Sequence, residues 1–339
     1  MKQIRKKTAM PSCSDYRAAI ASPLSIMDPS LKGGKPVEQN NRLIMYSGGF
    51  CVVFPFQLVN KKYAIRCWHV RVHNIRARIR KISKKLRQLQ LPYFVEFAFR
   101  DKAILTSAGL QPVVKMEWVE ADNMKKYMVK NRYDKFVMKK LADSFLEMVK
   151  VLHQYRISHG DLQHGNILVK KDGSLVLVDY DSMYVPDLAG EKEEIKGLPG
   201  YQHPARYSSA YVSPYADYFS ELVIYLSVLA LVKMPELWNE LKIEDSEELV
   251  FSGKDFASKG SSPIFKRLLS CNDSLIKSLT NALIDFCGKN SILDLKPLEE
   301  VVRPPVNIGS VCCKWVSTMF DSKKQPVFLL DIKSISEKW

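Results

Sequence analysis

Three polar residues in the middle of the chain have the types and the spacing that phosphoryl transfer requires. Asp161 is followed five positions later by Asn166, and Asp179 comes thirteen positions after that. Transfer from a metal-bound nucleotide needs one carboxylate to orient the attacking hydroxyl, and an amide with a second carboxylate to hold Mg²⁺ on the phosphates. Asp161, Asn166 and Asp179 are therefore the candidate catalytic residues, with Asn166 and Asp179 as metal ligands.

The surrounding sequence predicts the elements that position these residues. The apolar run 175–178 follows a Lys-Asp-Gly turn and indicates a buried strand that presents Asp179 at its end. Before His159, apolar residues recur at helical spacing and predict a helix over 138–152. Asp and Asn also cap turns in many proteins. Turn formation alone, however, does not require a strand that delivers a second Asp.

The segments His159-Gly160-Asp161-Leu162, Asn166-Ile167-Leu168 and Asp179-Tyr180-Asp181 resemble the catalytic and metal-binding segments of the protein-kinase-like superfamily. The resemblance extends from about Tyr46 to about Pro297. It implies an α+β, two-lobed fold, with a small β-rich N-lobe and a larger helical C-lobe. Two later segments fit the same order.

The first of these segments, Gly200-Tyr201-Gln202-His203-Pro204, resembles the end of an activation segment. The second, Asp217 to Ser220, resembles the start of a buried helix whose aspartate holds the backbone of the catalytic loop. By the same resemblance, Asp161 orients the substrate hydroxyl and His159 packs beneath the loop.

The resemblance also implies ATP with Mg²⁺, or Mn²⁺ in its place, and assigns the residues that bind the nucleotide. Gly48 and Gly49 stand where glycines let the backbone approach the phosphates, although such a pair is also typical of a hairpin turn. Arg66 occupies the position of the strand lysine that contacts the phosphates, and its guanidinium keeps the positive charge. The residues assigned to the adenine pocket are Met116, Glu117 and Val119.

Several positions depart from the family pattern. The predicted helix over 69–91 contains no Glu, so the usual Lys–Glu ion pair cannot form, and Glu96 is the nearest candidate partner for Arg66. Gly160 replaces the arginine that reads a phosphorylated activation loop, and no Ser or Thr lies between Met183 and Arg206. These departures argue against control by loop phosphorylation.

The formal net charge of +15 predicts attraction to anions such as nucleotides, acidic proteins or nucleic acid. Part of it lies on the predicted helix 69–91, where an apolar stripe leaves the basic residues on the other faces. A solvated face is favoured for the stretch 71–87 over an acidic or nucleic-acid partner. The stripe is Ile75, Ile79, Ile82 and Leu86, and the basic residues are Arg71, Arg76, Arg78, Arg80, Lys81, Lys84, Lys85 and Arg87.

The sequence favours a cytoplasmic protein that has no contact with membranes. No apolar stretch approaches the roughly 18 residues that a membrane span needs. The basic stretch Met1 to Thr8 lacks the apolar segment of a secretory signal. The seven cysteines show no metal-type spacing and are odd in number, which indicates reduced thiols.

We divide the chain into an N-terminal arm (1–40), an N-lobe (41–118), a C-lobe (119–305) and a C-terminal extension (306–339). The arm contains several prolines and glycines and is expected to be irregular.

Three functions remain open. An ATP- and Mg²⁺-dependent Ser/Thr protein kinase is favoured because all three residues with metal or proton duties are present. A pseudokinase that acts as a nucleotide-binding or scaffold module is favoured by the lost lysine and glutamate. A small-molecule kinase is the third, since His-Gly-Asp is also the form seen in aminoglycoside and choline phosphotransferases.

A finer resemblance rests on three short segments. They are similar to a bacterial group of Ser/Thr kinase-like proteins often found beside a phosphatase and a von Willebrand-type protein. This resemblance implies a protein substrate and a partner phosphatase. The segments are Tyr63 to Trp68, Lys115 to Val119 and Tyr201 to Pro204.

Overall fold

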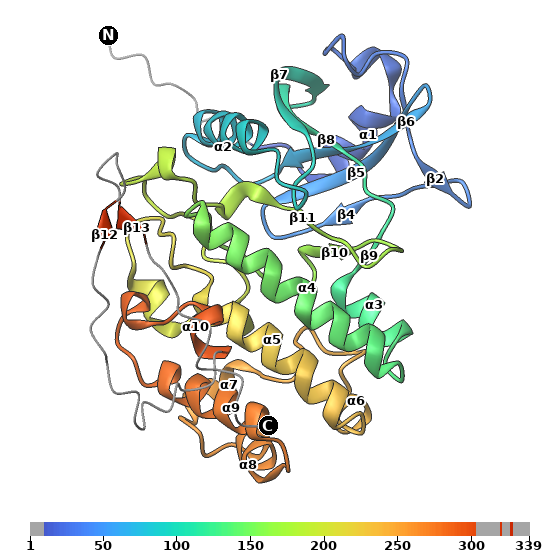
Figure 1. Ribbon diagram of the computed structural model, residues 1–339. Helices are drawn as coiled ribbons and strands as arrows, with labels where there is room; N and C mark the ends of the chain where they lie inside the picture. Colours follow the sequence, from blue (N-terminus) through green and yellow to red (C-terminus); the bar gives the residue numbers. More distant parts are fainter. Residues whose placement is uncertain (1–9, 303–318, 321–325, 328–339) are drawn as a thin grey trace. The chain divides into compact units, whose positions relative to one another are not determined.

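Alternating apolar residues build an antiparallel sheet in the N-terminal part of the chain (Figure 1). The computed structural model describes residues 10–302, 319–320 and 326–327. Val52, Phe54 and Phe56 of β5 are fully buried in one core, as their period of two predicts. The strand order is β1-β5-β6-β8-β7, with β4 also paired to β5. The strands are β1 (Lys35–Pro36), β4 (Tyr46–Ser47), β5 (Cys51–Leu58), β6 (Lys61–Trp68), β7 (Phe97–Thr106) and β8 (Gly109–Glu117), and a separate pair is β2 (Glu38–Gln39) and β3 (Arg42–Leu43).

The N-terminal segment is not the irregular arm that its prolines and glycines predict. It contains α1 (Cys13–Ala21), which prolines flank but do not interrupt. Ser12 accepts the Asp15 N–H and Asp15 accepts the Ser12 N–H, which forms a capping box. Tyr16 and Ile20 are buried in the core that includes β5. Each such burial contributes about 1.5–3 kcal/mol, so this segment is part of the folded domain.

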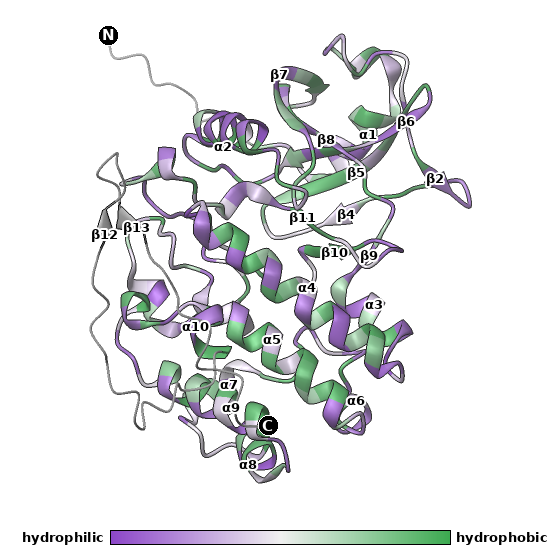
Figure 2. Cartoon of the chain, in the orientation of Figure 1, coloured by the Kyte–Doolittle hydropathy of each residue, from purple (hydrophilic) through white to green (hydrophobic). Residues whose placement is uncertain are grey.

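Helix α2 (Ile75–Leu89) packs its predicted apolar stripe against the sheet. Ile79, Ile82 and Leu86 are buried in the same core as Phe97 of β7. Figure 2 shows hydrophilic residues along α2 and a hydrophobic β5. The helix begins later and ends earlier than the predicted range 69–91.

The segments 97–99 and 103–106 are separated by three charged residues. They contribute to the single strand β7, whose pairing with β8 shifts register between Arg100 and Ile104. Lys102 has a left-handed backbone with φ of 48°. The polar residues in this stretch therefore mark an irregularity within one strand and not a turn between two.

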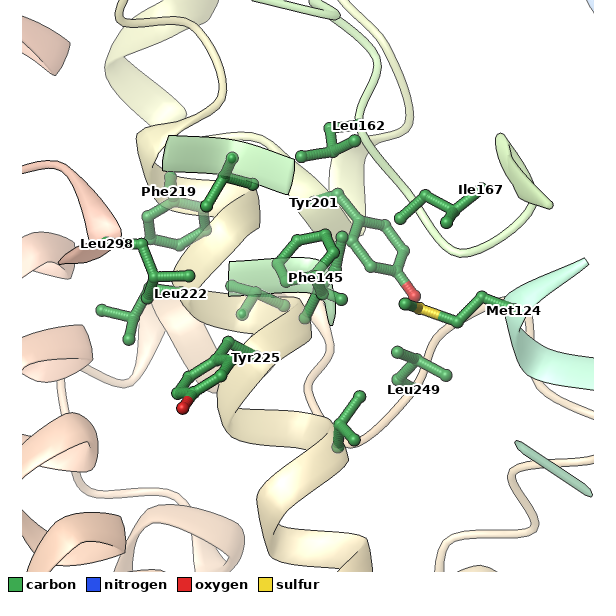
Figure 3. Close-up of a cluster of buried hydrophobic side chains, with 14 of the residues drawn as sticks. Met124, Phe145, Leu162, Ile167, Tyr201, Phe219, Leu222, Tyr225, Leu249 and Leu298 are labelled. Atoms are coloured by element: carbon green, nitrogen blue, oxygen red, sulfur yellow. The ribbon is translucent and has the colours of Figure 1, made fainter. Parts of the chain in front are cut away.

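The C-terminal part of the domain is helical, and the predicted α+β, two-lobed fold is confirmed (Figure 1). The predicted helix 138–152 is α4 (Lys135–Gln154), and α5 (Tyr218–Lys233) is buried along most of its length. Phe145 of α4 lies beside Tyr201 and Leu222 in the core (Figure 3). The other elements are β9 (Asp122–Asn123), α3 (Met124–Lys130), β10 (Ile167–Val169), β11 (Leu175–Leu177), α6 (Leu237–Glu240), α7 (Gly253–Ala257), α8 (Pro263–Ser270), α9 (Ser274–Cys287) and α10 (Leu298–Val302).

The chain up to Val302 forms one compact unit, and the residues after it form a second, of which only the short strands β12 (Met319–Phe320) and β13 (Pro326–Val327) are described. The proposed boundary at 305/306 lies outside the described residues. The proposed boundary at 118/119 falls within the first unit, one residue beyond the end of β8. Within the described ranges, no helix is long and apolar enough to cross a membrane.

A histidine whose side chain is 9% exposed links three helices of the helical part. His153 of α4 lies 2.9 Å from a carboxylate oxygen of Glu221 through Nε2, and 2.9 Å from one of Glu299 through Nδ1. Burial acts against the charged imidazole. The two carboxylates outweigh it and raise the pKa of His153 from its ordinary value of 6.5 to about 9. The protonated ring therefore joins α4, α5 and α10.

We expect this contribution to stability to disappear as the pH rises. A raised folded-state pKa stabilises the fold fully below about 6.5, and the stabilisation, on the order of 3 kcal/mol, is lost as the pH passes through about 9. Urea denaturation of the wild type and of His153→Gln near pH 6 and pH 9 measures the effect. The wild type should lose more stability than the variant over this range, and parallel pH dependence would contradict the assignment.

Candidate active site

A buried carboxylate holds the loop that carries Asp161. Asp217, which directly precedes α5, accepts the backbone N–H of His159 and, at 2.9 Å, that of Gly160. Asp217 is 2% exposed, so these hydrogen bonds form away from water. The predicted role of Asp217 as the residue that holds the catalytic loop is confirmed.

His159 lies beneath the loop, as predicted, and connects it to the strand before Asp179. The imidazole is fully buried. Its Nδ1 accepts the backbone N–H of Asp161 at 3.3 Å, and its Nε2 lies 2.8 Å from the carbonyl oxygen of Val178. Because a carbonyl only accepts, Nε2 carries the hydrogen. One side chain thus positions both candidate carboxylates.

The structure brings Asp161, Asn166 and Asp179 together. Nδ2 of Asn166 donates to the carbonyl oxygen of Asp161 at 2.8 Å and to its Oδ2 at 3.1 Å. The N–H of Val178 donates to the carbonyl oxygen of Asn166 at 3.0 Å, which places Asp179 beside the loop. Because Nδ2 is engaged, the amide oxygen is the atom of Asn166 left to bind a cation.

The two carboxylates lie in different electrostatic environments. Burial, followed by the charge of Asp179, raises the pKa of Asp161 above its ordinary value. Burial acts the same way on Asp179, but the guanidinium of Arg66 brings the pKa of Asp179 below its ordinary value. A raised pKa makes Asp161 the better proton acceptor, whereas Asp179 stays ionised.

Arg66 pairs with residues of the Asp-Tyr-Asp segment and not with Glu96, so that expectation was wrong. Its Nη2 lies 2.7 Å from Oδ1 of Asp179 and 2.8 Å from Oδ2 of Asp181. The Arg66 residue is 8% exposed, whereas Glu96 is exposed and cannot serve as a buried partner. The Nε of Arg66 is buried and has no acceptor among the described residues. The guanidinium therefore retains a donor beyond its two ion pairs.

Arg78 is a residue of the site that the sequence reasoning missed. Its Nε donates to the carbonyl oxygen of Asp181, and its Nη2 to that of Met183, both at 2.7 Å. It is 7% exposed, so the expectation of a solvated basic face fails at this position. Position 78 lies three residues after Ile75 and four before Ile82, on the buried stripe. That spacing could have identified it.

Packing explains the glycine at position 160. Gly160 has φ of +77°, and a Cβ there would lie 2.2 Å from the carbonyl oxygen of Ser182. Ser158 and Tyr184 form a bridge beside it, so the two backbones run in close contact. An arginine at position 160 would disrupt this contact.

The residues assigned to nucleotide binding lie at the sheet end of this site. Gly48 and Gly49 follow β4, are exposed and do not have positive φ, and neither is crowded by a neighbour. Neither packing nor backbone geometry therefore requires glycine there. Met116 is buried in β8, Glu117 ends that strand, and Val119 follows it half-buried.

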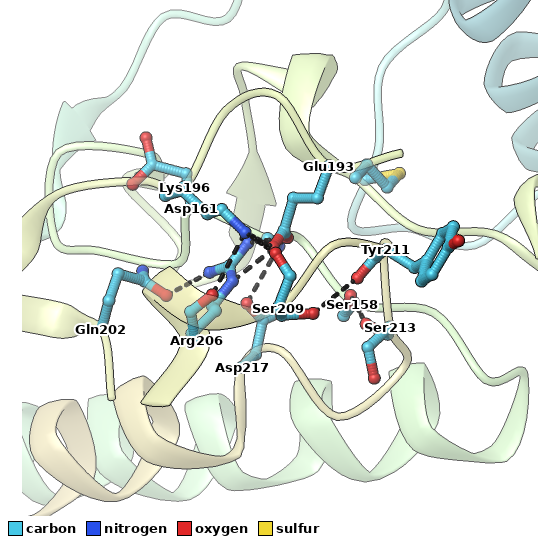
Figure 4. Close-up of polar contacts among 12 residues, drawn as sticks. Ser158, Asp161, Glu193, Lys196, Gln202, Arg206, Ser209, Tyr211, Ser213 and Asp217 are labelled. Atoms are coloured by element: carbon cyan, nitrogen blue, oxygen red, sulfur yellow. Dashed lines mark hydrogen bonds and ion pairs between the residues drawn. The ribbon is translucent and has the colours of Figure 1, made fainter. Parts of the chain in front are cut away.

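The segment after Asp181 is fixed by a buried ion-pair network (Figure 4). Nη2 of Arg206 lies 2.6 Å from Oε1 of Glu193, and the two side chains are 1% and 3% exposed. Lys196 lies 2.9 Å from the other oxygen of Glu193, and Arg206 also donates to Gln202. These contacts hold residues 193–206 to one another.

Asp161 also contacts this segment. Its Oδ1 accepts the backbone N–H of Leu198 at 2.8 Å. A Cβ on Gly197 would lie 2.6 Å from that oxygen, so the close approach depends on glycine. The segment therefore fixes the orientation of the Asp161 carboxylate.

A cavity of about 530 Å³ lies between the start of α2 and the segment 191–195. Arg78 and Asp181 are among the residues that line it, but none of the residues assigned to nucleotide binding is. It is therefore distinct from the proposed nucleotide position.

The donor set suits a metal ion that arrives with phosphate. Across the described part of the chain, no three His, Cys, Asp or Glu residues form a metal site of their own. Mg²⁺ is usually bound by one or two carboxylates together with substrate phosphates. Asn166 and Asp179 supply an amide oxygen and an ionised carboxylate, which fits that pattern.

Comparisons with known proteins agree with this geometry. A family model described as protein kinase domain matches residues 47–285. A fowlpox virus protein named probable serine/threonine-protein kinase FPV212 is 46% identical over 75 residues, 22% of this chain and 25% of the viral protein. The mitosis inhibitor protein kinase SWE1 of Candida albicans is 24% identical over 135 residues, 38% of this chain and 12% of that protein. The matches thus span a quarter or less of either relative.

Two glycines with the same φ provide a test of the contact at Asp161. Gly190 and Gly197 both have φ of +78°, but a Cβ on Gly190 meets nothing within 4 Å. We expect Gly190→Ala to lower the free energy of unfolding by about 1–2 kcal/mol through backbone strain. Gly197→Ala should lower the free energy of unfolding by about 1–3 kcal/mol more than Gly190→Ala does, because the added methyl group displaces Asp161. Urea denaturation measures both, and equal losses would show that the contact is not restrictive.

Proposed function

This chain belongs to the protein kinase domain family, and from that premise we propose that it is an ATP- and Mg²⁺-dependent phosphotransferase acting on Ser or Thr of a protein. The convergence of Asp161, Asn166 and Asp179 supports the proposal most directly. The buried guanidinium of Arg66 on Asp179 adds a cation beside them.

The nucleotide would be held by residues from both sides of this site. Gly48 and Gly49 leave the backbone open to the phosphates, and Arg66 has a donor without an acceptor. Asn166 and Asp179 would hold the metal ion, which supplies positive charge against the phosphate oxygens when bound. The adenine would lie against Met116, the carbonyl of Glu117 and the N–H of Val119.

In the proposed reaction, Asp161 orients the substrate hydroxyl and accepts its proton. The hydroxyl oxygen forms a bond to the terminal phosphorus of ATP. The bond from that phosphorus to the bridging oxygen breaks, and ADP leaves with the electron pair. Oδ1 and Oδ2 of Asp161 accept one hydrogen bond each from Leu198 and Asn166, and a carboxylate has about four acceptor positions. Room for the hydroxyl proton therefore remains.

We also propose the finer features that the sequence suggests. These are a place in the bacterial group found beside a phosphatase and a von Willebrand-type protein, a partner phosphatase, a cytoplasmic location, and lobes that divide after residue 118. They rest on the three short segments and the composition described above.

A dedicated partner for the basic stretch 71–87 is not favoured. Arg76 and Arg80 pair with Asp101 at 2.8 and 3.0 Å, and Lys81 pairs with Glu191 at 2.5 Å. Acidic groups of the same chain therefore already offset part of this charge.

The first test is transfer of labelled phosphate from ATP to dephosphorylated casein with Mg²⁺ or Mn²⁺. We expect Asp161→Asn to lower turnover by about 10²–10⁴-fold, because it removes the proton acceptor. Asp179→Asn should abolish metal-dependent turnover and leave the fold intact. Asp143→Asn, which changes an exposed carboxylate of α4, is the matched control and should retain activity.

The other functions predict different outcomes of this assay. Stabilisation by nucleotide without turnover would indicate a pseudokinase. Transfer to kanamycin or choline in preference to casein would indicate a small-molecule kinase. A protein that neither binds nucleotide nor transfers phosphate would refute the proposal.

The second test addresses Arg66. Arg66→Lys should keep measurable turnover because the positive charge remains, whereas Arg66→Ala should weaken ADP binding by about tenfold or more. Titration calorimetry with ADP measures the affinity. If Arg66→Ala folds and binds ADP as tightly as the wild type, the residue does not contact phosphate.

A further inference from the structure

Arg66 lacks the partner that the family pattern would provide. Helix α2 contains no acidic residue, and Glu96 is exposed. The described ion pairs of Arg66 are with Asp179 and Asp181, which belong to one short segment. Asp181 stands where that segment usually has a glycine, so its carboxylate is an addition to the site.

The Asp181 carboxylate is built into the site and is not a surface charge. It is 3% exposed. Its Oδ2 accepts hydrogen bonds from Arg66 Nη2 and from Trp68 Nε1, each at 2.8 Å. Residues 66 and 68 lie two apart on β6 and so share one face of the strand. Two donors from the sheet therefore converge on one oxygen.

The backbone of Asp181 is held by a different element, helix α2. Arg78 of α2 donates to the carbonyl oxygens of Asp181 and Met183. Tyr180, the residue between the two aspartates, is buried, and its hydroxyl donates to the carbonyl oxygen of Leu177 at 2.7 Å. Helix α2 thus contacts the main chain of this segment through Arg78, and the backbone of Asp181 has a contact that does not involve Arg66.

Arg66 uses a single nitrogen, Nη2, for both carboxylates. Asp179 is also the proposed metal ligand. Without the charge of Asp181, the guanidinium would be left with Asp179 as its ion-pair partner among the described residues. It would then compete with the metal ion for that carboxylate.

We propose that Asp181 replaces the helix glutamate as the counter-ion of Arg66 and is a positioning residue that keeps Asp179 available for the metal. This inference rests on the proposed function and deepens it. It assigns to the last residue of the Asp-Tyr-Asp segment a role that α2 cannot perform, since α2 supplies only a cation at Arg78.

The test is a calorimetric titration in which MgCl₂ is added to the full-length protein at saturating ADP. Asp181→Asn keeps the size of the side chain and an oxygen for the Trp68 N–H. It should raise the Mg²⁺ concentration for half-saturation by about tenfold. Glu221→Gln, which also removes a buried ion-paired carboxylate, should leave that concentration within about twofold of the wild type.

A double-mutant cycle separates positioning from a purely structural role. In an Arg66→Gln background the competing guanidinium is gone, so Asp181→Asn should have no further effect on Mg²⁺ binding. If Asp181 only supported the fold, the same loss would occur in both backgrounds. That additive result would overturn the inference.

Trp68→Phe provides a second variant in case Asp181→Asn does not fold. It removes the N–H donor but keeps an aromatic ring beside Phe99, and it should shift Mg²⁺ binding in the same direction by about threefold. Unchanged Mg²⁺ binding in whichever of these variants folds would overturn the inference while the proposed function stands. A wild type that does not bind ADP would overturn both.

Discussion

The site depends on burying one guanidinium between two carboxylates. Arg66, Asp179 and Asp181 come from β6 and from the segment after β11, and their contact joins the sheet to the helical part of the domain. Removing one member of a buried ion pair costs about 3–5 kcal/mol because a charge is left unpaired. The neighbouring elements therefore have to hold all three groups in place. Trp68, Arg78 and Tyr180 contribute hydrogen bonds to or within this segment.

A second constraint is the close approach of backbones around the catalytic loop. Gly160 lies against the carbonyl oxygen of Ser182, and Gly197 lies against Oδ1 of Asp161. Both have positive φ, so a side chain would be strained as well as crowded. Neither position has room for a side chain in the arrangement in which Asn166 bonds Asp161. Close packing thus requires glycine at position 160. The same glycine stands where the family pattern has an arginine that binds a phosphorylated activation loop.

The sequence predicted the local parts of this arrangement well. Asp161, Asn166 and Asp179 lie within nineteen positions of one another, and short-range patterns bring them together. The errors concern contacts between distant segments. The partners of Arg66 lie more than a hundred positions away, and a missing Glu in a helix does not indicate which carboxylate replaces it. Similarly, composition suggested an irregular N-terminal arm because nothing local shows that a sheet face needs Tyr16 and Ile20 to cover it.

Arg78 is buried although its charge and its place on a basic helix predict that it is exposed to solvent. A basic residue on a basic helix is most simply placed in water. At this position the helix faces two main-chain carbonyls that have no other donor among the described hydrogen bonds, and a guanidinium can satisfy both at once. Burial lowers the pKa of Arg78, yet nearby carboxylates that include Glu191 and Asp181 oppose this effect. Because the contact is to backbone, it fixes the path of the segment whatever side chains the segment carries. In the family pattern the helix presents a glutamate to the site, whereas α2 presents the cation of Arg78. The carboxylate that balances Arg66 therefore has to come from the segment that contains Asp181.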